Sequence, residues 1–505
     1  MSRQSTSGCF PPQPLLKALT IFGLSLFMSL LQASPSLSAE IDPVTLNQLR
    51  SIWQRANDTI DAMEDTEFVE GCCPAWAWKR NWLTDLAKVQ ARTGDRAVVQ
   101  QTILRAKQII EGKSSLGLLQ MALVGYAQAS IPDREGATIT LQEALNLAQQ
   151  PEFERVRDTI VPTVVRAYAR VGEVAQALSA ADMIRDPYWK SIALAAAATE
   201  QLQEKESRTS AVFIMHALEV YTGITNIRDQ AAVLRAIGVA QIKTDAAIAG
   251  MKTLERALAT ARSISDLTYQ IDALTYLGSD YLEIQMSDEG RRVLAEAVKL
   301  AKQIEKEQDK ADRLWRIAWY QARHREFGIV NLTLQDAYAS ATKVEDPASK
   351  ADVVREIGEV YAIAGQTSLA WERFDEAQRI ALALPQDSLR ISTLQFLAKA
   401  QADAGNTVKA VQTARSIGGD DHEMNYTYYY IALAQTKAGD FEGALRSFHA
   451  ITNDSHLKAE ITQEIAKAIS AQGDHDSAYT WANSLSSPRE RVGAFLGMAE
   501  GLVAH

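Results

Sequence analysis

The chain has 505 residues, of which 52 are Lys or Arg and 62 are Asp or Glu, and its net charge is −10 at pH 7. An acidic surface of this kind disfavours nucleic acid and anionic membranes, so we expect neither as a partner. The length exceeds what one compact core usually occupies, so the chain should hold several domains or an array of repeats.

The first 39 residues have the three parts of a secretory signal peptide. Arg3 and Lys17 precede an apolar run from 19 to 31, and small residues follow as far as Ala39. The apolar run is too short to span a membrane. We therefore predict cleavage near Ala39 and a periplasmic or secreted protein without a transmembrane segment. An uncleaved N-terminal anchor is the alternative.

Two adjacent cysteines, Cys72 and Cys73, would be the only thiols left after cleavage, because Cys9 lies within the signal peptide. An oxidising compartment favours a disulfide between them. Their Cα atoms are ~3.8 Å apart across a trans peptide, which is closer than a relaxed disulfide requires. A strained vicinal disulfide and two unreacted thiols are therefore the main alternatives, with an intermolecular bond or a metal as the third.

Residues 40–76 are predicted to form an N-terminal helix and a loop that caps one end of the body. The stretch EGCCPAWAWKRNW, residues 70–82, contains the loop. Pro74 suits the beginning of a helix, and Trp78 and Trp82, four apart, would share one face of it. The end unit of a repeat array needs a cover for its apolar layer, and these tryptophans could supply it.

Residues 77–505 read as one repeated unit. Alanine is abundant, and runs of alternating β-branched residues do not occur, so the sequence indicates an all-α fold. Similar segments lie between pairs of amphipathic stretches and contain Gly94, Gly172, Gly365, Gly405, Gly439 and Gly473. Glycine suits the left-handed end of a first helix, and the polar residue after it suits the start of a second. We predict about eleven helical hairpins and a closing helix from Arg489.

The repeat resembles the tetratricopeptide repeat, because successive glycines after Gly405 are 34 residues apart. The best match is VVREIGEVYAIAGQTSLAWERFDEA, with the family's positions filled by Ile357, Gly358, Tyr361, Gly365, Ala370, Phe374 and Ala377. The closing proline of the motif is replaced, and the spacing drifts elsewhere. The resemblance implies a right-handed α-solenoid. Independently of the family, Gly358 falls where two helices must approach closely, with Tyr361 and Phe374 beside it.

The resemblance also implies a binding surface, the concave face lined by the first helix of each hairpin. Carried over position by position, that face includes Asp352, Arg355, Glu359, Ser392, Gln395, Lys399, Tyr426, Tyr429, Glu460, Gln463 and Lys467. Helical spacing turns Tyr428 towards the hairpin core and its neighbours Tyr426 and Tyr429 towards the groove. Ordinary partly buried aromatics are the alternative interpretation of these tyrosines.

Sequence motifs for catalysis, metal binding or cofactor binding are absent. The seven histidines form no HxxxH or HExxH pair, and no GxSxG, phosphate-binding loop or GxGxxG occurs. The cluster DDHEMNY, residues 420–426, is better explained as a helix N-terminus with acidic residues than as a metal site. We therefore expect no enzyme activity, no metal and no cofactor.

These patterns favour an exported, non-catalytic scaffold that binds a protein or peptide partner in its groove. A solenoid offers a long preformed surface without a closed catalytic pocket. Two alternatives stay open. One is a cell-wall or carbohydrate-active enzyme with acidic residues gathered on the groove. The other is a structural subunit of an envelope complex that assembles through the ends of the array.

Overall fold

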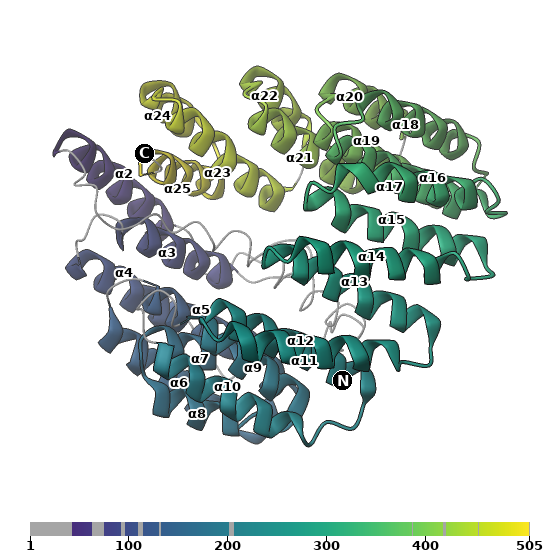
Figure 1. Cartoon of the computed structure of the whole chain (residues 1–505). Coiled ribbons are helices and arrows are strands. Elements are labelled where there is room, and N and C mark those ends of the chain that lie inside the picture. Colours follow the sequence, from purple (N-terminus) through teal and green to yellow (C-terminus); the bar gives the residue numbers. More distant parts are fainter. Residues whose placement is uncertain are drawn as a thin grey trace, which may run out of the picture. The chain divides into compact units, whose positions relative to one another are not determined.

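The computed structural model describes residues 43–62, 75–91, 96–109, 115–130, 133–200, 207–385, 387–417, 421–452 and 454–503. Within these ranges the chain forms helices and no strand (Figure 1), which confirms the all-α class. None of the described helices is both long and apolar enough to cross a bilayer. The predicted signal peptide and the pair Cys72 and Cys73 lie outside the described residues.

The predicted hairpins are found as consecutive pairs of helices. Their first helices are α3 (Ala75–Ala91), α5 (Ser115–Ala129), α7 (Glu154–Arg170), α9 (Pro187–Glu200), α11 (Ile227–Lys243), α13 (Leu267–Glu283), α15 (Glu307–Arg323), α17 (Pro347–Ile363), α19 (Asp387–Asp403), α21 (Asp421–Lys437) and α23 (Ser455–Ala471). Their second helices are α4 (Arg96–Ile109), α6 (Arg134–Ala148), α8 (Val174–Asp182), α10 (Ser207–Tyr221), α12 (Ala247–Arg262), α14 (Ser287–Ala301), α16 (Phe327–Ala341), α18 (Thr367–Leu382), α20 (Thr407–Ser416), α22 (Phe441–Ala450) and α24 (His475–Ser484). The helix α2 (Pro43–Asp61) precedes them and α25 (Pro488–Leu502) follows.

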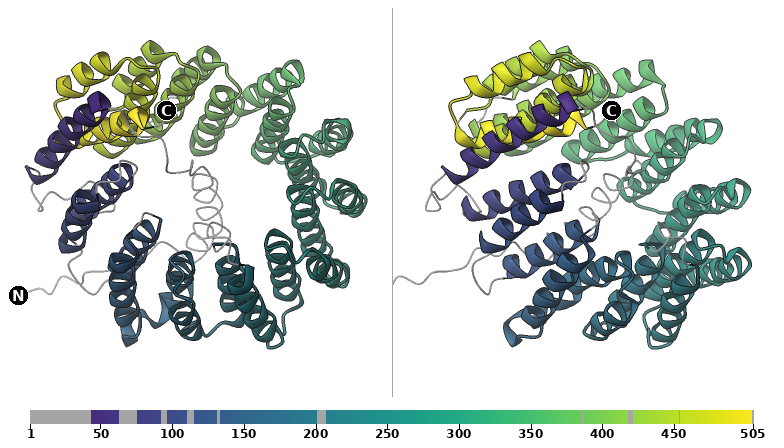
Figure 2. Two further views of the ribbon diagram at one scale, coloured as in Figure 1. Left: turned by 60° about the vertical axis from the view of Figure 1, so that its left-hand side comes forward. Right: turned by 90° about the vertical axis from the view of Figure 1, so that its left-hand side faces the viewer.

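The helices form two layers. Each odd-numbered helix packs against its hairpin partner and against the odd-numbered helices of the neighbouring hairpins, as in α5, α7 and α9 or α15, α17 and α19. The even-numbered helices make their main contacts with the odd-numbered ones (Figure 2). A hairpin thus buries its apolar stripe only by stacking on its neighbours, which is the reason that such units repeat.

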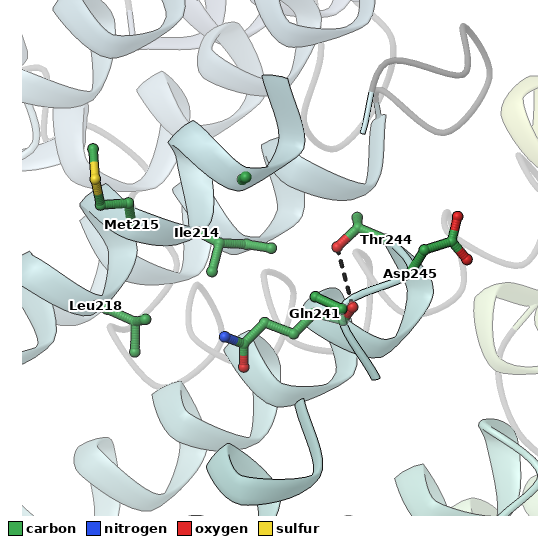
Figure 3. Close-up of a pocket in the computed structure, with 8 residues that line it drawn as sticks. Ile214, Met215, Leu218, Gln241, Thr244 and Asp245 are labelled. Atoms are coloured by element: carbon green, nitrogen blue, oxygen red, sulfur yellow. Dashed lines mark hydrogen bonds between the residues drawn. The ribbon is translucent and has the colours of Figure 1, made fainter. Parts of the chain in front are cut away.

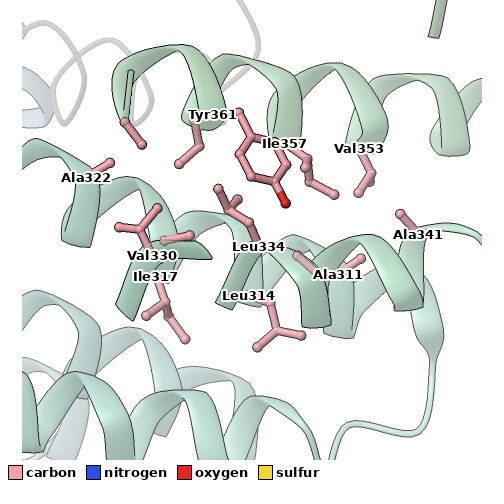
Figure 4. Close-up of a cluster of buried hydrophobic side chains, with 14 of the residues drawn as sticks. Ala311, Leu314, Ile317, Ala322, Val330, Leu334, Ala341, Val353, Ile357 and Tyr361 are labelled. Atoms are coloured by element: carbon pink, nitrogen blue, oxygen red, sulfur yellow. The ribbon is translucent and has the colours of Figure 1, made fainter. Parts of the chain in front are cut away.

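One continuous core runs from α11 to α21. Figure 4 shows part of it, a cluster that includes Leu314 and Ile317 of α15, Leu334 of α16 and Ile357 of α17. These side chains are fully buried, as the periodic apolar pattern of the sequence requires. The predicted close approach at Gly358 is confirmed, because a Cβ at this residue would lie 2.8 Å from a ring carbon of Phe374.

In the hairpins whose turns lie wholly within the described residues, the turn contains one residue with positive φ. Glycine fills this position at Gly172, Gly365, Gly405, Gly439 and Gly473, where φ lies between 75° and 88°. In three central hairpins the same position is held by Asp245, Gln285 and Arg325, with φ of 64°, 66° and 60°. The glycine pattern therefore disappears from residues 225–343 although the turn does not.

The two ends of the array meet. The last helix, α25, packs against α23 on one side and against α2 and α3 on another. Three glycines of α25 let it lie directly on α23, because side chains there would overlap carbonyl oxygens of that helix: Gly493 over Ala459, Gly497 over Gln463 and Gly501 over Lys467. At the junction with α24, the guanidinium of Arg55 in α2 stacks on the ring of Tyr479 at 5.1 Å.

This contact was not anticipated. The sequence pattern predicted a capping loop at a free end of the array, whereas α25 is covered by α2. The predicted loop itself lies outside the described residues; Trp82, which follows it in α3, is buried. The contact of α25 with α2 and α3 also covers the two ends of the array. A structural subunit of an envelope complex, the alternative considered above, would need those ends for assembly.

Candidate functional site

The surface predicted to bind a partner belongs to the odd-numbered helices. On α17, Asp352, Glu356 and Glu359 follow each other at helical spacing and lie opposite Ile357 and Gly358, which face the hairpin partner. We name the corresponding surface of α11 to α23 the odd-helix face. It holds all the residues that the tetratricopeptide resemblance assigned to the groove.

Local sequence fixes the start and the end of α17, and hence the register of its functional side chains. The side chain of Asp346 accepts a hydrogen bond from the backbone N–H of Ser349 at 2.8 Å, and Pro347 occupies the first helical turn. Gly365, with φ of 75°, lies in the turn that follows the helix. The three carboxylates between these ends are therefore presented on one side.

Charged side chains of the odd-helix face form ion pairs that join one repeat to the next. The pairs are Arg235 with Asp280 at 2.7 Å, Lys243 with Glu283 at 2.7 Å and Arg313 with Asp272 at 3.2 Å. In all three pairs the basic residue lies on α11 or α15 and the acidic residue lies on α13. Such pairs fix the register of the repeats, and they leave a face of mixed charge rather than one field of a single sign.

A cluster of carboxylates surrounds one buried guanidinium on α17. Arg355 is 9% exposed and bonds to Glu359 and, at 3.2 Å, to Glu356. Burial raises the pKa of Glu356 to about 7, against the opposing effect of Arg355. Burial also raises the pKa of Asp352 and of Asp312, which belongs to α15. Burial thus outweighs the nearby cations, Arg355 beside Asp352 and Arg316 beside Asp312, in setting the pKa of these carboxyl groups.

Towards α19 and α21 the odd-helix face becomes aromatic. Phe396 is 55% exposed, and the guanidinium of Arg355 lies 5.6 Å from its ring centroid. Lys399 donates a hydrogen bond to Asp403 at 2.8 Å, and its ammonium lies 5.2 Å from the ring of Tyr430. Each cation here is thus shared between an acid and an aromatic ring from the next helix.

The tyrosines of α21 differ in their surroundings. Tyr428 packs against the apolar core, whereas Tyr426 is 43% exposed. Burial and a hydrogen bond with Glu460 of α23 raise the pKa of the Tyr429 hydroxyl. Tyr429 and Glu460 therefore belong to one contact between repeats, and Tyr426 is the more exposed of the two tyrosines.

The other residues assigned to the groove have partners within the chain. Gln463 and Lys467 of α23 both donate hydrogen bonds to Glu500 of α25 at 2.8 Å. Ser392 donates to a backbone carbonyl of its own helix, and Gln395 is half-buried. The structure thus pairs Arg355 with Glu359, Tyr429 with Glu460, and Gln463 and Lys467 with Glu500, rather than leaving all the predicted residues in one open line.

Sequence reasoning missed several side chains of this face. Glu356 could have been found, because it stands four residues after Asp352 on the same helical face. Phe396 and Tyr430 gave no signal beyond their aromatic character. A second buried cluster was also missed: Tyr126 of α5 and both Arg166 and Arg170 of α7 bond to Glu200 of α9, which is 6% exposed. The spacing of four between the two arginines was the available signal.

Within the described ranges, no group of three His, Cys, Asp or Glu side chains is placed to hold a metal ion. The side chain of His422, in the acidic cluster considered above, lies outside them.

No protein-family model matches the sequence, and no curated protein matches it. Solved structures with a similar fold include a Rap protein complexed with competence and sporulation factor, with 13% identity over 68% of this chain and 99% of that one and a TM-score of 0.28. The human IFIT1 dimer with PPP-AAAA has 13% identity over 88% of this chain and 95% of that one, with a TM-score of 0.28. A signal-transduction ATPase with a tetratricopeptide-repeat sensor, from Pyrococcus horikoshii, has 13% identity over 87% and 72%, with a TM-score of 0.28.

These similarities concern helical-repeat folds and carry no argument about partner or activity. The tetratricopeptide-like array of helical hairpins is confirmed by the helices of the chain itself.

Proposed function

We propose that the protein is an exported, non-catalytic scaffold that binds a protein or peptide segment along the odd-helix face. One observation carries this proposal. Between α17 and α21 the face combines exposed aromatic rings, Phe396 and Tyr426, with charges that are already paired inside the chain. Aromatic side chains supply large contact area at small entropic cost, and the paired charges supply a polar surround.

The mixed charge of the face supports a peptide as the occupant. An extended polypeptide carries donors, acceptors and charges of both signs, which match a surface where acidic and basic side chains alternate. A polyanion would instead meet the carboxylates of Asp312, Asp352 and Glu356. We therefore propose a protein or peptide rather than nucleic acid, and capture experiments can distinguish the two.

The test is crosslinked capture by the intact chain from an envelope fraction, with both protein and nucleic acid identified. The captured protein is then expected to bind the double variant F396A/Y426A at least about tenfold more weakly, because exposed interface aromatics often contribute most of the affinity. Phe327 is the matched control, since it is 44% exposed but belongs to the even-numbered layer. Equal loss in F327A, or capture of nucleic acid alone, would contradict the proposal.

A further inference from the structure

A hollow of about 490 Å³ lies between α10 and the turn that joins α11 to α12 (Figure 3). It is lined by Ala211, Ile214, Met215 and Leu218 of α10 and by Gln241, Thr244, Asp245 and Ala246. Its size falls within the ~300–1,000 Å³ of typical ligand sites. Because α10 belongs to the even-numbered layer, this hollow is separate from the odd-helix face.

A buried glutamine of the hollow lacks a hydrogen-bond donor. Gln241 is 6% exposed, and no described group donates to its side-chain oxygen, Oε1. Corresponding glutamines of α19 and α21 are satisfied: Gln401 accepts from the hydroxyl of Thr413, and Gln435 from that of Ser447, each at 2.7 Å. In both pairs the hydroxyl stands twelve residues after the glutamine.

Gln241 departs from this arrangement, and so does Gln321 of α15, whose Oε1 also has no donor while the hydroxyl of Thr333 bonds within its own helix. Thr253 stands at the equivalent position, but its hydroxyl donates to the carbonyl oxygen of Ala249 at 3.0 Å. Figure 3 shows the side chain of Gln241 extending towards Ile214 and Leu218 of α10. A buried acceptor without a donor destabilises the fold, and rotation about the soft terminal torsion of the glutamine can turn the buried Oε1 towards the hollow. A ligand that brings a donor into the hollow would therefore recover a hydrogen bond that the chain does not make.

The other polar groups of the hollow also offer acceptors. The hydroxyl of Thr244 donates to the carbonyl oxygen of Ala240 at 2.8 Å, so its free lone pairs can only accept. Asp245 is exposed, and its carboxylate has no ion pair among the described residues. On the apolar side of the lining, Met215 is 58% exposed. The lining thus has an apolar wall, formed by Ile214, Met215 and Leu218, and a rim of hydrogen-bond acceptors that includes the negative charge of Asp245.

We propose that this hollow binds a segment of a partner protein in which an aliphatic side chain stands beside a lysine or arginine. The aliphatic side chain packs against Ile214 and Met215. The cation reaches the carboxylate of Asp245, and a donor of the segment satisfies Oε1 of Gln241. This pairing of an apolar body with a positive charge is the chemistry that complements the wall and the rim together.

A phage-displayed library of random peptides, panned on the full chain, tests the proposal. The enriched peptides should carry an aliphatic residue beside Lys or Arg, and their fluorescein-labelled forms should bind in a polarisation assay. The variant A211W changes an exposed residue and fills the hollow, so it should weaken binding at least about tenfold. D245G should weaken binding about fivefold at low salt, and the difference should shrink as salt rises.

D245G separates lost binding from lost folding, because glycine suits the positive φ of this residue. The matched control is R325G, which makes the same change in the turn after α15 and should leave binding unaltered. Enrichment of no peptide, enrichment without a basic residue, or undiminished binding by A211W and D245G would overturn the proposal.

A small organic cation is the competing occupant of the hollow. If n-hexylamine displaces the labelled peptide at comparable concentration, the site takes such cations and the assignment to a protein segment is wrong. Peptide binding that persists in F396A/Y426A is expected, because those residues lie on the odd-helix face. The proposals for the hollow and for the odd-helix face can therefore be refuted independently of each other.

Discussion

At the scale of single residues, the chain keeps two kinds of strained position. One is the set of turns in which a residue with a side chain takes positive φ, and the other is the carboxyl cluster around Arg355. In both, neighbouring structure imposes a state that the residue alone would avoid. Each therefore predicts a substitution that stabilises the fold.

The turn after α15 provides the first prediction. Arg325 has φ of 60°, and a left-handed conformation costs a residue with a Cβ ~1–2 kcal/mol relative to glycine. Part of that gain is offset by the greater freedom of glycine in the unfolded chain. R325G should therefore raise the free energy of unfolding by ~0.5–1 kcal/mol, measured by urea denaturation. The reverse change, G365A, should lower it, and a gain in G365A would refute the explanation.

The carboxyl cluster predicts a pH dependence of stability. The pKa of Glu356 is raised from 4.5 to about 7 by burial, with Glu359, Asp312 and Asp352 raising it further and Arg355 opposing them. A carboxyl with a raised pKa contributes stability that is fully present below its unfolded pKa and is lost as pH rises through the folded pKa. The free energy of unfolding should therefore fall between about pH 4.5 and about pH 7.

The variant E356Q removes this titration. It should flatten the fall in that window and stabilise the protein by ~1–2 kcal/mol above it, because an uncharged amide avoids the cost of ionising a buried group. The comparison is E372Q on α18, where the carboxylate is 59% exposed and bonds to Arg373 at 3.1 Å. Equal slopes in the wild type and in E356Q would show that Glu356 does not carry the effect.

At the scale of helices, α25 differs from every helix that the repeat pattern predicts. It is apolar around most of its circumference, and its buried residues face α23, α2 and α3. A helix covered on several sides lies at a centre of packing rather than at an edge. Its glycines at spacing four match carbonyl groups of α23 at the same spacing, so the two backbones lie in direct contact.

That contact predicts the effect of a large side chain in α25. In G497L the leucine would displace the helix from the backbone of α23, and we expect a loss of at least ~3 kcal/mol in the free energy of unfolding. Hydrogen exchange should also show lost protection in α2. G328L is the control, because a Cβ at Gly328 would meet no atom within 4 Å. Unchanged protection of α2 in G497L would mean that α25 does not hold it.

At the scale of the molecule, the sequence predicted the hairpins and not their closure. The repeated glycines, the close approach at Gly358 and the burial of Tyr361 follow from local spacing, so they could be read from one unit at a time. Contact between α2 and α25 depends on two helices that lie far apart in the sequence and outside the repeat. The repeat period of the sequence gives no information about a contact between helices that lie outside the repeat.

The same limit applies to the candidate site. Position-by-position transfer found Arg355 and Glu359, because α17 matches the repeat closely. It could not show that Arg355 is buried and neutralised, since burial depends on α19 and its Phe396. The hollow at Gln241 had no sequence signal. A residue with a hydroxyl follows the glutamine by twelve positions both where it donates to the glutamine, as Thr413 does, and where it does not, as in Thr253.

The junction of α2 with the C-terminal hairpin also imposes an order on folding. Arg55 and its partner Asn483 are 428 residues apart, so α2 can be covered only after almost all of the repeats that follow it have been synthesised. During that interval Leu49, Ile52 and Trp53, which the finished fold buries, are exposed to other proteins and to other copies of the chain. A premature stop that removes α25 should therefore leave the apolar side chains of α2 exposed, where chaperones that bind apolar segments would recognise them.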